Sequence, residues 1–298
     1  MNRKIVILLS IVGLLGIGTL LFLNPLTPKQ QYFPQKLHIV ASFYPMAYFA
    51  SQIAGDTADI TNITPAGAEP HDYEPSTQDI AKMEQANLII LNGAVEPWGD
   101  KIKTNLENSS VRIITAGEGL TTNGDPHVWL DPILAKQEVQ RISDAIISIN
   151  PSNSAFYTAN TTTLLQKLDQ LDAQYKTGLA NCSIKDIVTS HVAFGYLAQQ
   201  YGLNQIGISG LSPDEEPSAQ SLIDTARFVR DHNVKYIFFE SLVSPKLSQT
   251  IANETHAQTL ELNPLEGLTA DEVQQGKDYF SVMQSNLHNL QTALVCTT

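Results

Sequence analysis

The sequence contains only two cysteines, Cys182 and Cys296, among its 298 residues, and neither belongs to a CxxC pair. This argues against a zinc site built on paired cysteine thiolates. In an oxidising compartment the two cysteines could form one disulfide, and otherwise they are two separate thiols. The sequence alone leaves both alternatives open.

Basic residues are also few. The chain has 18 Lys and Arg against 30 Asp and Glu, which gives a formal net charge of −12. A general nucleic-acid-binding surface is therefore not expected, and the body of the protein should attract cations weakly. Hydrophobic residues make up 43% of the chain, which is enough for one large domain or for two lobes of moderate size.

Long apolar runs are absent except for one, at residues 5–23, which follows the basic start "MNRK". This segment is predicted to be either a signal peptide or an N-terminal membrane anchor. Neither an Ala-x-Ala site nor a lipidation cysteine follows it, so cleavage stays open. Both alternatives place the rest of the chain outside the cytoplasm, because the basic residues tend to stay inside.

From residue 37 onward, short β-branched runs alternate with helical patterns. Strands separated by helices in this way predict parallel βαβ units. Strands are predicted at 37–43, 58–65, 88–93, 111–117, 186–191, 204–210, 235–241 and 259–263, and helices at 44–55, 76–86, 132–150, 154–179, 194–202, 218–233, 244–256 and from about 270.

The alternation is interrupted only by the two long helical stretches between residues 132 and 179. We therefore predict an α/β fold of two Rossmann-like lobes with parallel sheets, joined by a long rigid backbone helix. The predicted division is a signal or anchor with its linker (1–35), an N-terminal lobe (36–142), a linking helix (143–180) and a C-terminal lobe (181–298).

Three of the seven histidines follow predicted strands. His71 follows the second strand, His127 lies in the loop "NGDPHVWLDP", and His191 ends the strand "DIVTSH". Ligands of open α/β sheets bind at the carboxyl ends of strands, and three converging imidazoles suit tetrahedral zinc. The residues therefore favour a metal site. Of the remaining histidines, His38 begins a strand, and the others fall late in or at the ends of helices, where the helix dipole explains them: His232, His256 and His288.

The motifs "EPHDYEPS", "DPHVWLDP", "TSHVAFGYLAQQYGL" and "LNPLEGLT" occur in one order along the chain. In these motifs the chain resembles the metal-specific solute-binding proteins of ABC transporters, and most of all their zinc-uptake branch, from about residue 37 to the C-terminus. "NGAVEPW" at residues 92–98 also resembles a segment of that branch. The resemblance implies an extracytoplasmic, monomeric, high-affinity zinc receptor that is no enzyme and delivers Zn²⁺ to a membrane permease.

The resemblance also implies which residues bind the metal, in the cleft between the lobes. His71, His127 and His191 match the histidine ligands of the zinc-uptake branch, whereas the manganese branch has a carboxylate where His191 stands. Many relatives place an aspartate where this chain has Asn263, but a subgroup with "NPLEGL" uses the glutamate three positions on. Glu266 is therefore the predicted fourth ligand, with Asn263 or a water molecule as the alternatives.

Two other functions use similar sets of ligands. A manganese or iron receptor of the same family would prefer oxygen ligands to a third imidazole. A zinc-dependent hydrolase also uses three histidines with an open fourth position, but the sequence has no HExxH motif. Three carboxylates, those of Glu69, Asp125 and Asp131, could orient the histidine rings, although turn capping is expected of the last two. The two tryptophans are expected to cover the cleft or pack in the core.

Overall fold

The computed structural model describes residues 36–297. The predicted signal or anchor at residues 1–35 lies outside the described residues and stays a prediction. Across the part of the chain that is described, no helix combines the length and the apolar character that are needed to cross a membrane.

The first half of the described chain is built on a four-stranded parallel sheet in the order β2-β1-β3-β4. The inner strand β3 is buried at every residue, as its unbroken apolar run predicts. A capping box at Ser76 and Asp79 starts the helix that follows the second strand. The short helix α4 was not predicted. The elements are β1 (Leu37–Ala41), α2 (Tyr44–Ala54), β2 (Ala58–Asn62), α3 (Thr77–Glu84), β3 (Leu88–Leu91), α4 (Gly99–Asn105) and β4 (Arg112–Thr115).

The second half repeats this arrangement, with a parallel sheet in the order β6-β5-β7-β8. Every strand and helix predicted between residues 186 and 263 is present, with shorter bounds. The elements are β5 (Asp186–Thr189), α7 (Gly195–Tyr201), β6 (Asn204–Gly207), α8 (Ala219–Asp231), β7 (Tyr236–Phe239), α9 (Lys246–Thr255) and β8 (Gln258–Glu261).

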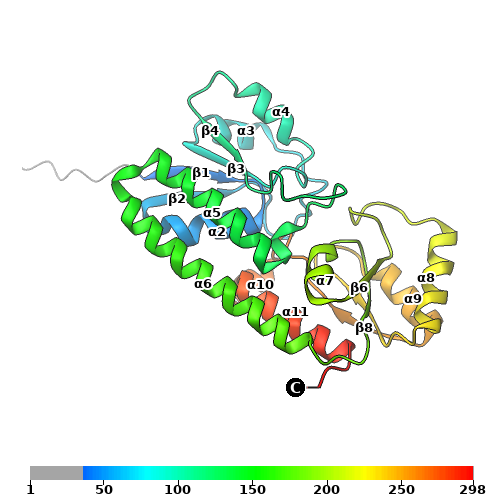
Figure 1. Ribbon diagram of the computed structural model, residues 1–298. Coiled ribbons are helices and arrows are strands. Elements are labelled where there is room, and N and C mark those ends of the chain that lie inside the picture. Colours follow the sequence, from blue (N-terminus) through cyan, green and yellow to red (C-terminus); the bar gives the residue numbers. More distant parts are fainter. Residues whose placement is uncertain (1–35, 298) are drawn as a thin grey trace, which may run out of the picture. The chain divides into compact units, whose positions relative to one another are not determined.

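Two long helices, α5 (Pro132–Ile149) and α6 (Ser154–Leu179), connect the halves. The 26 residues of α6 span about 39 Å at about 1.5 Å per residue. This helix runs beside α2 and α5 of the first half and beside α7 and α11 further along (Figure 1). The predicted fold class, two parallel sheets joined by a long helix, is thus confirmed. The predicted domain boundaries stay a prediction.

The C-terminal region contains two helices where one was predicted from about residue 270. They are α10 (Ala270–Gln274) and α11 (Tyr279–Ala293), and the chain turns between them at Gly276, whose φ of 71° favours glycine. Asp278 then caps α11, so the single-helix prediction was wrong. Three short 3₁₀ helices complete the secondary structure: η1 (Gly55–Thr57), η2 (Val128–Leu130) and η3 (Pro151–Asn153).

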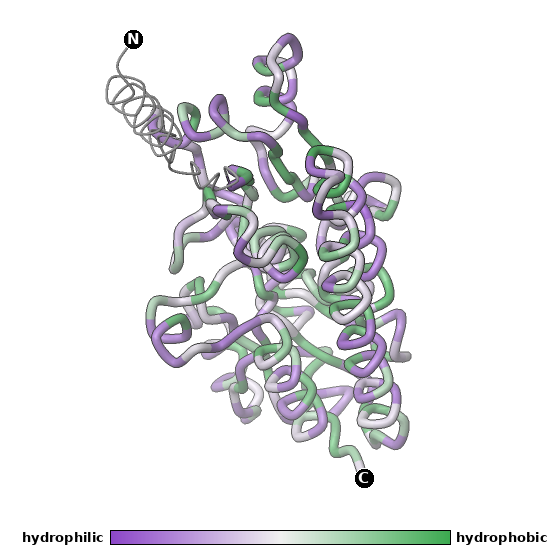
Figure 2. The backbone as a smooth tube through the Cα atoms, turned by 90° about the vertical axis from the view of Figure 1, so that its left-hand side faces the viewer, coloured by the Kyte–Doolittle hydropathy of each residue, from purple (hydrophilic) through white to green (hydrophobic). Residues whose placement is uncertain are grey.

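One cluster of buried apolar side chains extends through both halves and includes Phe49, Leu168, Phe194 and Leu262. The helices alternate between hydrophilic and hydrophobic residues along their length, as expected of helices with one face in this core (Figure 2). Cys182, after α6, and Cys296, after α11, form a disulfide. Of the two alternatives for the cysteines, the structure therefore has the paired one, which joins the ends of these helices.

Candidate metal centre

His71 lies in the loop between β2 and α3. This loop is tied to a segment far along the chain, because the Gly67 N–H donates a hydrogen bond to the Leu268 carbonyl oxygen at 2.9 Å. Within the loop, Glu69 accepts the backbone N–H of His71 through Oε1 at 3.1 Å. The His71 side chain is 10% exposed, so it lies at the rim of the candidate site rather than in its buried interior.

His127 lies between β4 and α5, at the start of η2. Asp125 Oδ1 accepts the backbone N–H of His127 at 3.0 Å and lies 2.7 Å from its ring Nδ1. Asp131 instead accepts the N–H of Ile133 at 2.8 Å and caps α5. Capping was the role expected of both carboxylates. It holds for Asp131, whereas Asp125 also orients the imidazole of His127.

His191 follows β5 closely, and its backbone is fixed there. Its carbonyl oxygen accepts hydrogen bonds from Thr189 Oγ1 at 2.6 Å and from Gln205 Nε2 at 3.1 Å. Its ring Nδ1 lies 2.7 Å from Oε1 of Glu240, which is buried. Sequence reasoning missed Glu240, although it stands at the carboxyl end of the strand next to that of His191. An acidic residue at that edge of the sheet was the available signal.

Glu266 lies in the loop after β8, and Asn263 shapes this loop. Asn263 Oδ1 accepts the N–H of Leu265 at 2.8 Å, and Leu265 takes a left-handed φ of 58°. Asn263 Nδ2 donates to Ser241 Oγ at 3.0 Å. The side chain of Asn263 is thus engaged in the loop itself, and the carboxylate of Glu266 is the group that reaches the histidines.

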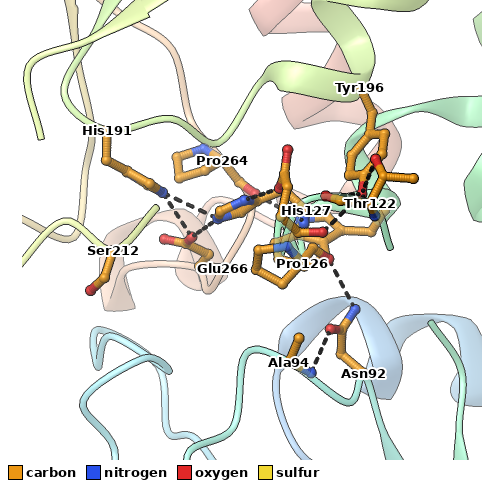
Figure 3. Close-up of polar contacts among 12 residues, drawn as sticks. Asn92, Ala94, Thr122, Pro126, His127, His191, Tyr196, Ser212, Pro264 and Glu266 are labelled. Carbon is orange, nitrogen blue, oxygen red and sulfur yellow. Dashed lines mark hydrogen bonds and ion pairs between the residues drawn. The ribbon is translucent and has the colours of Figure 1, made fainter. Parts of the chain in front are cut away.

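The structure brings together all four residues predicted as ligands. One ligand atom from each of His71, His127, His191 and Glu266 lies within 4.8 Å of all the others. Glu266 Oε1 is 3.2, 3.1 and 3.2 Å from the respective Nε2 atoms. Ligand atoms about 2.0–2.1 Å from a tetrahedral zinc ion are about 3.3 Å apart. The cluster therefore has the dimensions of a shell around one small cation, and His127, His191 and Glu266 point toward one another (Figure 3).

The two buried imidazoles turn the same ring nitrogen, Nε2, toward each other. Because Nδ1 of His127 faces Asp125 and Nδ1 of His191 faces Glu240, each Nδ1 donates its proton in a hydrogen bond to a carboxylate. The two Nε2 atoms then lie 3.3 Å apart, beside the Glu266 carboxylate. Nitrogen and oxygen atoms this close in a buried site are stable only when positive charge lies among them, as a proton or as a metal ion.

The charges around the site also favour a cation there. Burial by itself would lower the pKa of His191, but the carboxylates of Glu266 and Glu240 raise that pKa well above its usual value. His127 behaves alike: burial is outweighed by Asp125 and Glu266, and its pKa is raised. For Glu266, burial is outweighed by the three histidines, chiefly His191, so its pKa is well below the usual value. The cluster thus keeps one carboxylate charged and favours cations.

Other candidates from the sequence have other roles. Burial, and then the charge of Glu266, raise the pKa of Glu69 to about 9, so Glu69 is protonated at neutral pH and adds no second negative charge. Glu69 accepts a hydrogen bond from the backbone N–H of His71, whereas the sequence predicted a hydrogen bond to a histidine ring. Trp98 and Trp129 are both buried in apolar clusters, and the Trp129 ring also lies 5.2 Å from that of His127 between centroids.

Known proteins are similar to this chain along most of its length. The family described as "zinc-uptake complex component A, periplasmic" matches residues 39–293. The high-affinity zinc uptake system protein ZnuA of Bacillus subtilis (strain 168) is 38% identical over 281 residues, which cover 87% of this chain and 88% of that protein. The zinc-binding lipoprotein AdcA of Streptococcus pneumoniae (strain R6) is 39% identical over 277 residues, 86% of this chain, and the chain spans 55% of its length.

Among solved structures, the chain is similar to the Zn(II)-bound ZnuA-like domain of Streptococcus pneumoniae AdcA. The TM-score is 0.79 and the sequence identity is 40%, over 87% of this chain and 99% of that domain.

Proposed function

Because the chain belongs to the family of periplasmic zinc-uptake complex component A proteins, we propose that it captures Zn²⁺ outside the cytoplasm and delivers it to the permease of an ABC importer. The zinc ion is cargo, and the chain is a solute-binding receptor rather than an enzyme. Family membership therefore removes the basis for the zinc-hydrolase alternative.

The ligands that we propose are Nε2 of His71, His127 and His191 and a carboxylate oxygen of Glu266. The observation that carries the proposal is the convergence of these groups: Nε2 of His127 and Nε2 of His191 lie 3.3 Å apart, and Glu266 Oε1 lies 3.1–3.2 Å from all three Nε2 atoms. A divalent cation at the centre of these atoms supplies the positive charge that they need and displaces the protons between them. Three imidazoles and one carboxylate are a donor set typical of zinc, whereas a manganese or iron receptor would favour more oxygen ligands.

The arrangement of the ligands also lets the bound ion hold the two halves of the chain together. His71 and His127 come from the first half of the chain, and His191 and Glu266 come from the second. An ion bound by all four joins the halves, and four protein ligands leave no coordination position for a reacting water molecule. The same proposal includes action as a monomer and docking to a permease, which rest on family membership. It also includes membrane attachment through residues 1–35, which rests on the apolar run.

The test is zinc stoichiometry and affinity of the purified protein and of two matched variants. Glu266→Ala removes a proposed ligand, whereas Glu254→Ala removes the same charge from the exposed face of α9. We expect one zinc ion per chain in the unaltered protein and in Glu254→Ala. In a competition titration Glu266→Ala should bind more weakly by over about 100-fold, beyond the cost of losing an outer-shell partner.

Two results would contradict this proposal. Unchanged zinc affinity in Glu266→Ala would mean that water or another residue completes the shell. Absence of zinc from the unaltered protein, even after zinc is added, would mean that the four side chains do not form the site.

A further inference from the structure

The segment that carries His127, residues 122–130, is attached to the second half of the chain at its beginning. Tyr196 of α7 accepts the backbone N–H of Thr122 on its hydroxyl oxygen at 2.7 Å and donates to the carbonyl oxygen of Asp125 at 2.9 Å (Figure 3). The Asp125 carboxylate packs against Gly195, where a Cβ would come within 2.7 Å of Oδ2. A glycine is therefore required for this close approach.

The same segment is attached again at its end, through Trp129. The indole Nε1 of Trp129 donates a hydrogen bond to the carbonyl oxygen of Pro264 at 2.8 Å. Pro264 stands two residues before Glu266 in the loop after β8. One side-chain bond thus joins the segment of one proposed ligand, His127, to the loop of another, Glu266, across the two halves.

Packing fixes the direction of this bond. Trp129 is fully buried, with its ring 4.8 Å from that of Phe43 and 5.2 Å from that of His127 between centroids. On the backbone side, the Trp129 carbonyl oxygen accepts a hydrogen bond from the Tyr279 hydroxyl of α11 at 2.6 Å. The indole is therefore held from several sides, and its N–H is aimed at one acceptor.

The only other tryptophan differs in this respect. Trp98 is 5% exposed and lies in a separate apolar cluster of the first half. Within residues 36–297 its indole N–H has no hydrogen-bond partner. The chain therefore contains one tryptophan that only packs and one that also joins two ligand-bearing segments.

We propose that Trp129 is a positioning residue for the zinc site, which holds His127 and Glu266 at a fixed separation through its bond to Pro264. The two ligands then meet the ion as a preset pair, although they come from different halves of the chain. Metal affinity depends on such prior placement, because groups that are already in position need no reordering when the ion binds. This inference rests on the proposed function.

The first test replaces only the donor. Trp129→Phe keeps an aromatic ring in the core but loses the N–H, and it leaves the buried Pro264 carbonyl without this donor. We expect zinc affinity to fall about tenfold, as for other outer-shell partners of metal ligands, with most of the loss in faster dissociation. Trp98→Phe is the matched control and should bind zinc like the unaltered protein.

A double-mutant cycle separates positioning from a general loss of structure. Trp129→Phe is measured in a Glu266→Ala background and in a His71→Ala background, with zinc affinity as the readout. If Trp129 acts through the His127–Glu266 pair, the substitution should have little effect once Glu266 is absent. It should keep its effect of about tenfold when His71 is absent. Thermal unfolding of the metal-free variants checks that each one folds.

Unchanged affinity in Trp129→Phe, or an equal loss in both backgrounds, would overturn the inference while leaving the zinc receptor function intact. Failure of that function would instead appear as no zinc binding by the unaltered chain. If Trp129→Phe does not fold, Tyr279→Phe releases the same residue from its backbone side with little change of shape. It should show the same dependence on background, and equal losses would again overturn the inference.

Discussion

The two halves of the molecule have the same strand order but place their metal-site residues differently. In the second half, His191 and Glu240 stand directly beyond the ends of β5 and β7, two neighbouring strands of one sheet. In the first half, His71 and His127 lie within long loops that follow β2 and β4. Backbone hydrogen bonds between strands position the first pair, whereas the second pair depends on contacts made by loops.

These loop contacts reach into the other half. The His71 loop is bonded to the Leu268 carbonyl, and the His127 segment is bonded to Tyr196 and to Pro264. The two loops of the first half and the loop of Glu266 therefore hold one another in place, whereas His191 is positioned by its own sheet. In a receptor that must bind and later release its ion, this difference makes His191 the fixed ligand of the site.

The largest expected effect tests the ligand at the strand end, His191. His191→Asp replaces a nitrogen ligand at a strand end with a shorter oxygen ligand. We expect zinc affinity to fall by more than the roughly 100-fold upper range for outer-shell losses. The preference for manganese over zinc should rise, because manganese favours oxygen ligands. Competition titrations with both metals check this.

The matched variant His71→Asp sharpens the comparison. His71 lies at the rim of the site on a loop that can adjust, so the same substitution should weaken zinc binding less than His191→Asp does. If the two variants lose equal affinity, the strand end gives His191 no special role and the comparison fails.

A smaller effect is expected for the carboxylates that orient the rings. Glu240→Ala and Asp125→Ala each remove the acceptor of a ring N–H, and each should weaken zinc binding about 10–100-fold. Asp125→Ala should cost more, because Asp125 also accepts the backbone N–H of His127 at 3.0 Å. In the second half the strand already fixes the backbone of His191. Isothermal titration of both variants decides the order, and a larger loss in Glu240→Ala would contradict it.

Much of the fold could be predicted because the spacing of apolar residues and the caps of helices depend only on residues that are close together in the sequence. The run "LIIL" and the Ser76 cap are examples, and the structure has both where the sequence indicates them. The break between α10 and α11 was missed, since Gly276 and Asp278 lie inside an otherwise helical pattern. The break takes a left-handed glycine followed by a capping box, but a glycine and an aspartate also occur inside continuous helices, so the residue types alone did not indicate it.

The candidate site was likewise predicted only in part. Strand ends and family motifs indicated His71, His127, His191 and Glu266, which the structure brings together. Glu240 was missed because its partner lies 49 residues away along the chain, and only the pairing of β5 with β7 brings the two side chains together. Contacts between segments that are distant in sequence leave no local pattern, and this is why the bond from Trp129 to Pro264 was missed as well.

The smallest effect concerns pH, and it tests how strongly the cluster links the halves without zinc. Because the folded-state pKa values of His127 and His191 are raised, their contribution to stability is complete below the unfolded value of about 6.5. It is lost as the pH rises through the raised values. The pKa of Glu266 is lowered, so its contribution is complete above the unfolded value of about 4.3 and is lost as the pH falls through the folded value.

The zinc-free protein should therefore owe most stability to this cluster between about pH 4.5 and 6.5, and its unfolding midpoint should fall by on the order of a few degrees toward pH 8. Zinc reverses the slope, because the ion competes with protons for the imidazoles and stabilises more as the pH rises. Glu266→Gln, which removes the anion, should flatten the zinc-free curve. Thermal unfolding from pH 5 to 8, with and without zinc, measures both slopes. A zinc-free midpoint that rises from pH 6.5 to 8 would mean that the histidines of the two halves are not held together by Glu266 before the ion arrives.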